Sequence, residues 1–378
     1  MSILKKAYAK SARIISDMHR DNAYKAKNAA AHDRLKANPR PELTAEQKKE
    51  IDAYWAAYGI KFSDYSWFQL YYGMTGIADP RYIPQEFYFY MVLPYYNSRR
   101  LIQAYKDKNA FDTYIPKKYF PKTILKRISG DFYDKDGVFV TGDVNDPKLR
   151  EILSAHQSVI VENALDSGRG ENVKKHTFRT EEDIAAMLKT WNVRDYIVQE
   201  VLEQHPFMAQ FNESSVNIIR INSWYHDGKV EISTPVIRFG LPGYATDCCF
   251  IDGEEVVHLV GVTEDGLIRD KVIDLTGKVE NLSDYVSVND RRVPAWDKIT
   301  DMIRESAARL KHYHLIGWDI TVSADEEPVI IEYNILYPSP YSSQATDGPM
   351  WGEHTDQLLA FLKDKRNQDK YIPAKYRL

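Results

Sequence analysis

The stretch that decides the fold is residues 315–334, which read Leu-Ile-Gly-Trp-Asp-Ile-Thr-Val-Ser-Ala-Asp-Glu-Glu-Pro-Val-Ile-Ile-Glu-Tyr-Asn. Residues 315–322 and 329–334 are rich in β-branched and aromatic side chains, which favour strands. The residues between them have the composition of a turn. The sequence therefore predicts a β-hairpin.

Three oxygen-bearing side chains are embedded in the two arms: Asp319 in the first, and Glu332 and Asn334 in the second. Because side chains alternate along a strand, Glu332 and Asn334 point to the same face. If the loop is even in length and has no bulge, Asp319 pairs directly with Glu332 on that face. Adjacent carboxylates repel and lose hydration, which a hard cation such as Mg²⁺ relieves. The alternative is a solvated face with two ordinary surface acids.

The order Gly-Trp-Asp-Ile, then Val-Ile-Ile-Glu-Tyr-Asn, resembles the metal-binding end of the ATP-grasp fold. The resemblance is greatest to the sugar-transfer associated ATP-grasp family. It implies an α+β protein in which two lobes enclose a nucleotide cleft, preceded here by a helical N-terminal region. It also implies that Asp319, Glu332 and Asn334 hold Mg²⁺ against the phosphates of ATP.

Length and composition limit the alternatives. A chain of 378 residues predicts two or three lobes, and a formal net charge of −4 argues against a general nucleic-acid binder. We find no run of about 18 apolar residues and no signal peptide at the N-terminus. The only two cysteines, Cys248 and Cys249, are neighbours, so they provide neither a disulfide framework nor a four-cysteine zinc site. We expect a cytoplasmic protein.

We predict three parts, of which the second and third follow from the resemblance. Residues 1–105 form a helical N-terminal region, residues 106–200 the nucleotide lobe with a glycine-rich loop, and residues 201–378 the metal and substrate lobe. Residues 1–40 carry ten Lys/Arg and three acids, on a predicted helix over 1–36. Such a helix can contact an anionic membrane surface, or pack on the body with a solvated basic face.

Two further features of the N-terminal region carry predictions. Thr44-Ala-Glu-Gln is a capping box that opens a helix running to about residue 58. Many of the 26 tyrosines fall between Tyr54 and Tyr105. Tyrosine-rich surfaces bind sugars and other amphipathic ligands, but tyrosines also pack one lobe against another. Both interpretations stay open.

Other segments resemble the family in the same order along the chain. Asp107-Lys-Asn opens a helix, and the resemblance implies that Lys108 contacts ATP phosphate. A strand over 158–163 leads into a glycine-rich loop that would fold over the phosphates, and a strand over 195–202 would link the lobes and read adenine through its backbone. The implied nucleotide contacts in these two segments are Ser167, Gly168, Arg169, Gly170, Gln199, Glu200 and Leu202. Without the resemblance, a surface lysine, a tight turn and an edge strand explain the same residues.

The chain departs from the family pattern at Glu162. The family usually has a lysine there, which binds the α- and β-phosphates. A carboxylate at this position repels phosphate unless it faces elsewhere, and Arg169, Lys174 or Lys175 could supply the missing positive charge.

Arg220 lies mid-strand between isoleucines, where a lone charge is costly to bury and needs a partner. Its planar guanidinium suits phosphate or carboxylate. The resemblance implies a catalytic role, in which Arg220 binds the transferred phosphate or the substrate. The alternative is a buried ion pair, including one with Asp319 or Glu332. The segment Thr246-Asp-Cys-Cys also resembles the family and makes Asp247 a candidate substrate contact.

Together these segments imply a ligase that depends on ATP and Mg²⁺. It would join a small-molecule carboxylate to an amine or hydroxyl through an acylphosphate and release ADP, and a sugar in cell-surface polysaccharide biosynthesis is one candidate acceptor. Two alternatives keep the same site. One is an ATP-dependent kinase acting on a sugar or polyol hydroxyl. The other is a degenerate, non-catalytic nucleotide-binding scaffold, for which Glu162 is the best argument.

Overall fold

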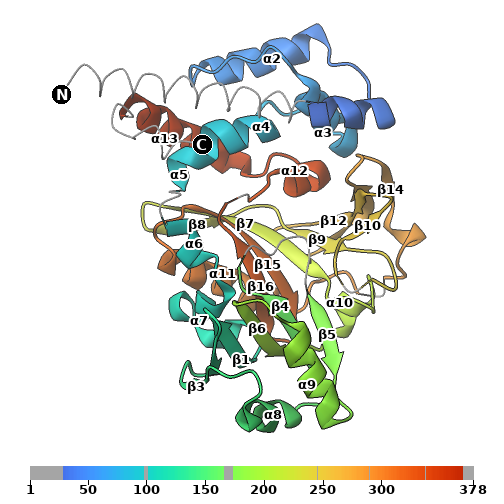
Figure 1. Cartoon of the computed structure of the whole chain (residues 1–378). Coiled ribbons are helices and arrows are strands. Elements are labelled where there is room, and N and C mark those ends of the chain that lie inside the picture. The colour runs from blue at the N-terminus through green and yellow to red at the C-terminus, as the bar shows by residue number, and fades with distance from the viewer. Residues whose placement is uncertain are drawn as a thin grey trace, which may run out of the picture.

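Three groups of elements are stacked in the molecule: a helical layer, a large antiparallel sheet and a smaller antiparallel sheet (Figure 1). The structure is a computed structural model that describes residues 29–97, 101–165, 173–244, 246–288, 290–336 and 338–368. Most of the predicted helix over residues 1–36 therefore lies outside the described residues, and residues 29–37 are helical. The predicted boundaries between the three parts of the chain stay a prediction.

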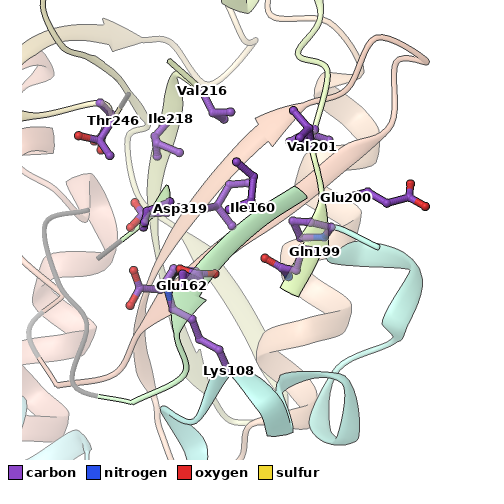
Figure 2. Close-up of a pocket in the computed structure, with 16 residues that line it drawn as sticks. Lys108, Ile160, Glu162, Gln199, Glu200, Val201, Val216, Ile218, Thr246 and Asp319 are labelled. Atoms are coloured by element: carbon purple, nitrogen blue, oxygen red, sulfur yellow. Dashed lines mark hydrogen bonds and ion pairs between the residues drawn. The ribbon is translucent and has the colours of Figure 1, made fainter. Parts of the chain in front are cut away.

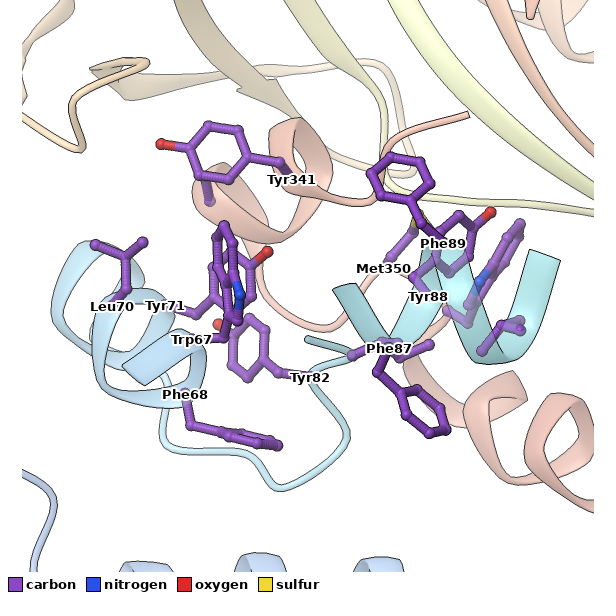
Figure 3. Packing of buried hydrophobic residues seen from close by; sticks show 14 of the residues in the cluster. Trp67, Phe68, Leu70, Tyr71, Tyr82, Phe87, Tyr88, Phe89, Tyr341 and Met350 are labelled. Carbon is purple, nitrogen blue, oxygen red and sulfur yellow. The ribbon is translucent and has the colours of Figure 1, made fainter. Parts of the chain in front are cut away.

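The helical layer combines elements from the first and the last parts of the described chain (Figure 1). Its elements are α2 (Ala45–Ala56), α3 (Ser66–Thr75), α4 (Gln85–Phe87), the π-helix η1 (Tyr88–Val92), α5 (Leu93–Tyr96), α12 (Tyr341–Asp347), η6 (Gly352–His354) and α13 (Thr355–Gln368). The predicted capping box is confirmed, because the Thr44 hydroxyl accepts from the Gln47 backbone N–H and the Gln47 side chain accepts from Thr44 N–H. Tyr71 and Tyr82 are fully buried and stack at 5.1 Å between ring centroids (Figure 3). These two tyrosines therefore pack inside the helical layer and are not part of a sugar-binding surface.

The smaller sheet has the strand order β3-β2-β1-β6-β4-β5. Its strands are β1 (Thr123–Ile128), β2 (Asp131–Asp134), β3 (Phe139–Thr141), β4 (Ser158–Asn163), β5 (Lys174–Thr177) and β6 (Tyr196–Glu200). Helices α8 (Pro147–Ser154) and α9 (Glu181–Thr190) pack on one face, where they meet Val159 and Val161 of β4. Because side chains alternate, Ile160 and Glu162 of the same strand point to the opposite face.

The large sheet has the order β14-β13-β12-β9-β7-β15-β16, and β8 also pairs with β7. Its strands are β7 (Ile218–His226), β8 (Lys229–Ile232), β9 (Val236–Phe239), β12 (His258–Val262), β13 (Ile268–Asp274), β14 (Val279–Asn281), β15 (Leu315–Val322) and β16 (Pro328–Asn334). Helix α11 (Trp296–Arg309) covers one face and buries Ile219, Trp318 and Ile330 with it. On the opposite face, Trp224 and Leu315 pack into the core of the helical layer.

Short elements connect these layers. They are α6 (Ile102–Tyr105), η3 (Lys108–Ala110), α7 (Phe111–Tyr114), η4 (Lys117–Tyr119), α10 (Pro206–Ala209), η5 (Leu282–Asp284) and a two-stranded ribbon of β10 (Cys249–Ile251) and β11 (Glu254–Val256). Cys248 and Cys249 are both buried, and neither forms a disulfide within the described part of the chain. Among the described residues, none of the helices is both long and apolar enough to cross a membrane.

The hairpin of β15 and β16 is confirmed, but its loop is not even in length and the hairpin contains a bulge. Val322 pairs with Pro328, so the loop has an odd number of residues, and the register then shifts by one between Ile320 and Asp319. Ile331 is the extra residue of this bulge, and beyond it Asp319 pairs directly with Glu332. A one-residue shift reverses the faces of a strand. Without the bulge, Glu332 would lie on the side of Trp318, in the apolar core under α11.

Glu86 gives the helical layer a stability that depends on pH. Its side chain is only 2% exposed, and burial raises its pKa from 4.5 to about 8. Above pH 4.5 the unfolded chain loses this proton, whereas the folded protein keeps it until about pH 8. We therefore expect the free energy of unfolding to fall across this window, by at most about 1.4 kcal/mol per pH unit, and to level off above it.

The measurement is urea denaturation of the wild type and Glu86→Gln at intervals from pH 5 to 9. Other groups titrate equally in both proteins, so the difference between the two curves isolates Glu86. We expect the stability of the wild type to fall relative to that of the variant as the pH rises. Parallel curves would show that the Glu86 carboxyl titrates as it does in the unfolded chain.

Candidate functional site

Three charged side chains lie in one row across the large sheet, on the face opposite α11. Asp319 of β15 is the direct cross-strand neighbour of Arg220 on one side and of Glu332 on the other. We call Arg220, Asp319 and Glu332 the charged row. Cross-strand neighbours bring their side chains within contact distance. The sheet itself therefore sets the order of the charges.

Arg220 and Asp319 form a bidentate ion pair. Arg220 Nε donates to Asp319 Oδ1 at 2.5 Å and Nη2 donates to Oδ2 at 2.8 Å, while Asn334 Nδ2 donates to the same Oδ2 at 3.0 Å. Their side chains are 11% and 13% exposed. The expected ion pair between Arg220 and Asp319 is thus present, and Asn334 joins the charged row through Asp319.

Glu332 is the carboxylate of the row that lacks hydrogen bonds to other described residues. Burial raises the pKa of its carboxyl, and the negative charges of Asp319 and Glu162 raise it further, against the opposing effects of Lys108 and Arg220. Glu332 is only partly exposed, a carboxylate with so little solvent around it is costly to ionise, and a nearby cation lowers that cost. The position is suited to binding a cation.

Glu162 faces the charged row from the smaller sheet. Lys108, at the start of η3, donates from Nζ to Glu162 Oε2, and its backbone N–H donates to Ala164 O at 3.0 Å. The two side chains are 8% and 9% exposed. Burial lowers the pKa of Lys108, but the combined charges of Glu162, Glu332 and Asp319 outweigh it and raise the pKa. Lys108, the predicted phosphate contact, is therefore paired with Glu162, the position that departs from the family pattern.

A cavity of about 190 Å³ separates the two sheets and ends at these charges (Figure 2). Its aliphatic walls come from Pro121, Ile160, Val173, Val201, Leu202, Val216, Ile218 and Ile331. Its polar lining comes from Lys108, Glu162, Gln199, Glu200, Thr246, Asp247, Asp319 and Glu332. Apolar walls with a few convergent polar groups are typical of small-molecule sites.

A second, half-buried ion pair lies beside the charged row. Arg238 Nε is 3.0 Å from Asp247 Oδ2, and Asp247 lines the cavity. Burial raises the pKa of Asp247, although Arg238 opposes this. Gly240 allows the backbone before Asp247 to approach closely, because a Cβ there would lie 2.8 Å from Thr246 O. Asp247, the predicted substrate contact, thus lines the cavity, and its role stays a prediction.

Most of the predicted site residues converge. Lys108, Gln199, Glu200, Leu202, Asp319 and Glu332 line the cavity, and Arg220 and Asn334 contact Asp319. Ser167, Gly168, Arg169 and Gly170 lie outside the described residues. The sequence analysis did not predict the aliphatic walls of the cavity. Ile160 and Ile218 alternate with core residues along their strands, and alternation alone does not tell a cavity face from a solvated one.

Comparison with known proteins places the chain in a family. The model of the family described as sugar-transfer associated ATP-grasp matches residues 155–348, slightly more than half of the chain. The chain belongs to the sugar-transfer associated ATP-grasp family. It has the ATP-grasp fold, with two α+β lobes around a cleft and a helical N-terminal region. A search of curated proteins found no match.

Solved structures similar to this ATP-grasp chain include three ligases. D-alanyl-alanine synthetase A from Vibrio cholerae has 14% identity and a TM-score of 0.40, over 68% of this chain and 65% of that one. VanG D-Ala:D-Ser ligase from Enterococcus faecalis has 11% identity and a TM-score of 0.41, over 68% and 61%. D-alanine–D-alanine ligase from Bacillus anthracis complexed with ATP has 14% identity and a TM-score of 0.38, over 72% and 70%. The chain thus spans slightly less than two thirds of the length of the first two.

Loss of the ion pair between Arg220 and Asp319 should lower the free energy of unfolding. Arg220→Met leaves Asp319 buried without its main partner, so we expect the free energy of unfolding to fall by about 3 kcal/mol. The double variant Arg220→Met/Asp319→Leu removes both charges and should recover much of that loss. Urea denaturation at pH 7 measures both.

The matched control is the surface pair of Lys298 and Glu327, whose side chains are 53% and 62% exposed. Lys298→Met should cost less than about 1 kcal/mol. If Arg220→Met lowered the free energy of unfolding no more than this control, the Arg220–Asp319 pair would contribute no more to stability than an exposed pair.

Proposed function

We propose that this protein is an ATP- and Mg²⁺-dependent ligase that joins a carboxylate to an amine or hydroxyl through an acylphosphate. The observation that supports it most is the charged row at the polar end of the cavity between the two sheets. A row of this kind offers oxygen ligands and a guanidinium on one rigid surface. Phosphoryl transfer needs little more from a protein than such positioning and charge.

The cavity walls suit the base of a nucleotide. Ile160, Ile218 and Ile331 present aliphatic surfaces. The paired part of β6 ends at Glu200, and Val201 and Leu202 line the cavity beyond the strand, where their backbone is proposed to read the adenine edge. The triphosphate would then extend toward Lys108 and the charged row.

The donor set fits Mg²⁺. Asp319 and Glu332 supply carboxylate oxygens and Asn334 an amide oxygen, and Mg²⁺ prefers oxygen ligands. The half-buried position of Glu332, without a hydrogen bond from the described residues, supports the same assignment. When bound, Mg²⁺ would neutralise charge on the transferred phosphate.

Arg220 is the proposed catalytic residue. Its guanidinium is held by Asp319 at a fixed position in the sheet, where it can orient the transferred phosphate. A substrate carboxylate oxygen would bond to the γ-phosphorus while the bond to the bridging oxygen breaks, which gives an acylphosphate and ADP. The amine or hydroxyl would then attack the acyl carbon, lose its proton to solvent and release phosphate. A sugar acceptor in cell-surface polysaccharide biosynthesis is part of this proposal.

The first test is calorimetric titration with a non-hydrolysable ATP analogue and Mg²⁺. We expect binding to the wild type and at least tenfold weaker binding to Asp319→Asn and to Glu332→Ala, because the first removes the negative charge of a cation ligand and the second removes a ligand altogether. Glu327→Gln, which removes an exposed carboxylate, is the control and should bind like the wild type. Unchanged affinity in both site variants would contradict the assignment.

The reaction products distinguish the proposed ligase from the alternative kinase. With a panel of carboxylates and amines or hydroxyls, the ligase releases one phosphate for each ADP. A kinase forms ADP and a phosphorylated product without free phosphate, and AMP with pyrophosphate would contradict both. Nucleotide binding without turnover of any substrate would favour the scaffold.

A further inference from the structure

The second half of the proposed reaction needs a group that takes a proton from the acceptor. Among the described residues that line the cavity there is no histidine, and the lysine of the lining, Lys108, is held as a cation by Glu162. The candidates for a proton acceptor are therefore the carboxylates of the lining. They are Glu162, Glu200, Asp247, Asp319 and Glu332.

Four of these five carboxylates have another assignment. Asp319 and Glu332 are the proposed cation ligands, and Glu162 is paired with a lysine. Glu200 ends β6, where its side chain is 42% exposed and adjoins the backbone proposed to read adenine. Figure 2 shows Glu200 on the other side of Ile160 from Asp319, away from the charged row. One carboxylate of the lining is left.

That carboxylate is Asp247. Its side chain is only 19% exposed, yet it accepts no hydrogen bond of good geometry from the described residues. Its ion-pair partner is Arg238, whose Nε lies 3.0 Å from Asp247 Oδ2 and which does not itself line the described cavity. Poorly solvated carboxylates are normally hydrogen-bonded. Asp247 is thus held from one side and keeps lone pairs for a donor on a ligand.

The order of the strands places Asp247 beside the charged row. Strand β9, which carries Arg238, adjoins β7, which carries Arg220, on the side away from β15. The charges of Asp319 and Arg220 both act on the Asp247 carboxyl. A phosphate oriented by Arg220 would therefore have the cation ligands on one side and Asp247 on the other.

We propose that Asp247 is a catalytic residue that takes a proton from the acceptor, and that the acceptor is an amine. The proposal rests on the proposed function, because it assumes an acylphosphate oriented by Arg220. An amine is protonated at neutral pH, so a carboxylate attracts its ammonium form and then removes the proton that blocks the lone pair. A hydroxyl is uncharged and lacks the first of these benefits.

The step balances with the groups present. The ammonium gives one proton to Asp247, and the freed nitrogen bonds to the acyl carbon while the bond from that carbon to the phosphate oxygen breaks. The nitrogen loses a second proton to the departing phosphate. Asp247 then returns its proton to solvent, and the products are an amide and phosphate.

The test compares two nucleophiles. Each carboxylate of the panel is first incubated with ATP, Mg²⁺ and hydroxylamine, which is mostly the neutral free base at pH 7 and converts an acylphosphate to a hydroxamate. The carboxylate that gives a hydroxamate is then used with ethanolamine, which is mostly protonated at pH 7 and carries both an amine and a hydroxyl. We expect the wild type to form the amide and not the ester.

In Asp247→Asn, formation of the amide should fall about 100-fold or more, because the ammonium keeps its proton. Formation of the hydroxamate should stay within twofold of the wild type, because hydroxylamine needs no proton removed before it attacks. Glu327→Gln, which removes an exposed carboxylate, is the control and should leave both rates unchanged.

Thermal melting first establishes that Asp247→Asn folds, since it leaves Arg238 without its partner. If it does not fold, Arg238→Met/Asp247→Asn removes both charges and replaces it, with the same expected rates. A fall of less than tenfold in amide formation, an equal loss of amide and hydroxamate, or an ester as the product would overturn the proposal. In each of these cases the hydroxamate formed by the wild type would still support the proposed function. No hydroxamate from any carboxylate would overturn both.

Discussion

The bidentate pair between Arg220 and Asp319 is the interaction on which the cavity depends. It joins neighbouring strands β7 and β15 across the face that looks toward the smaller sheet. Both side chains are nearly buried. Removal of either charge would therefore leave the other without a partner in a poorly solvated environment. The pair fixes one end of the charged row, and the bulge at Ile331 fixes the other by turning Glu332 to the same face.

The rest of the molecule keeps this surface in place from both sides. Helix α11 fills the opposite face of the large sheet, and the helical layer packs on part of the cavity face (Figure 1). Asn97 connects the layers, because its buried amide donates to Leu315 O and Ile335 O and accepts from Leu315 N–H. These contacts hold the ends of β15 and β16 together. The face left between the helical layer and the smaller sheet is the one that carries the charges.

Much of the fold was predictable because it follows from local patterns. The arms of the hairpin, β4 over 158–163 and the capping box at Thr44 all follow from periodicity and turn chemistry. The bulge was not predictable, since it compensates for an odd loop and depends on the burial of Trp318 on the other face. The pairing of Lys108 with Glu162 joins residues 54 positions apart in the chain, and spacing gave no sign of it. From the sequence, Glu162 is interpreted as a mismatch in the phosphate site. Its contact shows that the charge is matched within the site.

The most direct test of the central claim is a crystal structure with Mn²⁺ and a non-hydrolysable ATP analogue, using anomalous scattering to locate the metal. We predict an anomalous peak within bonding distance of carboxylate oxygens of Asp319 and Glu332, with the adenine between Ile160 and Ile218 in the cavity. A nucleotide bound outside the space between the two sheets, or a metal held away from the charged row, would contradict it.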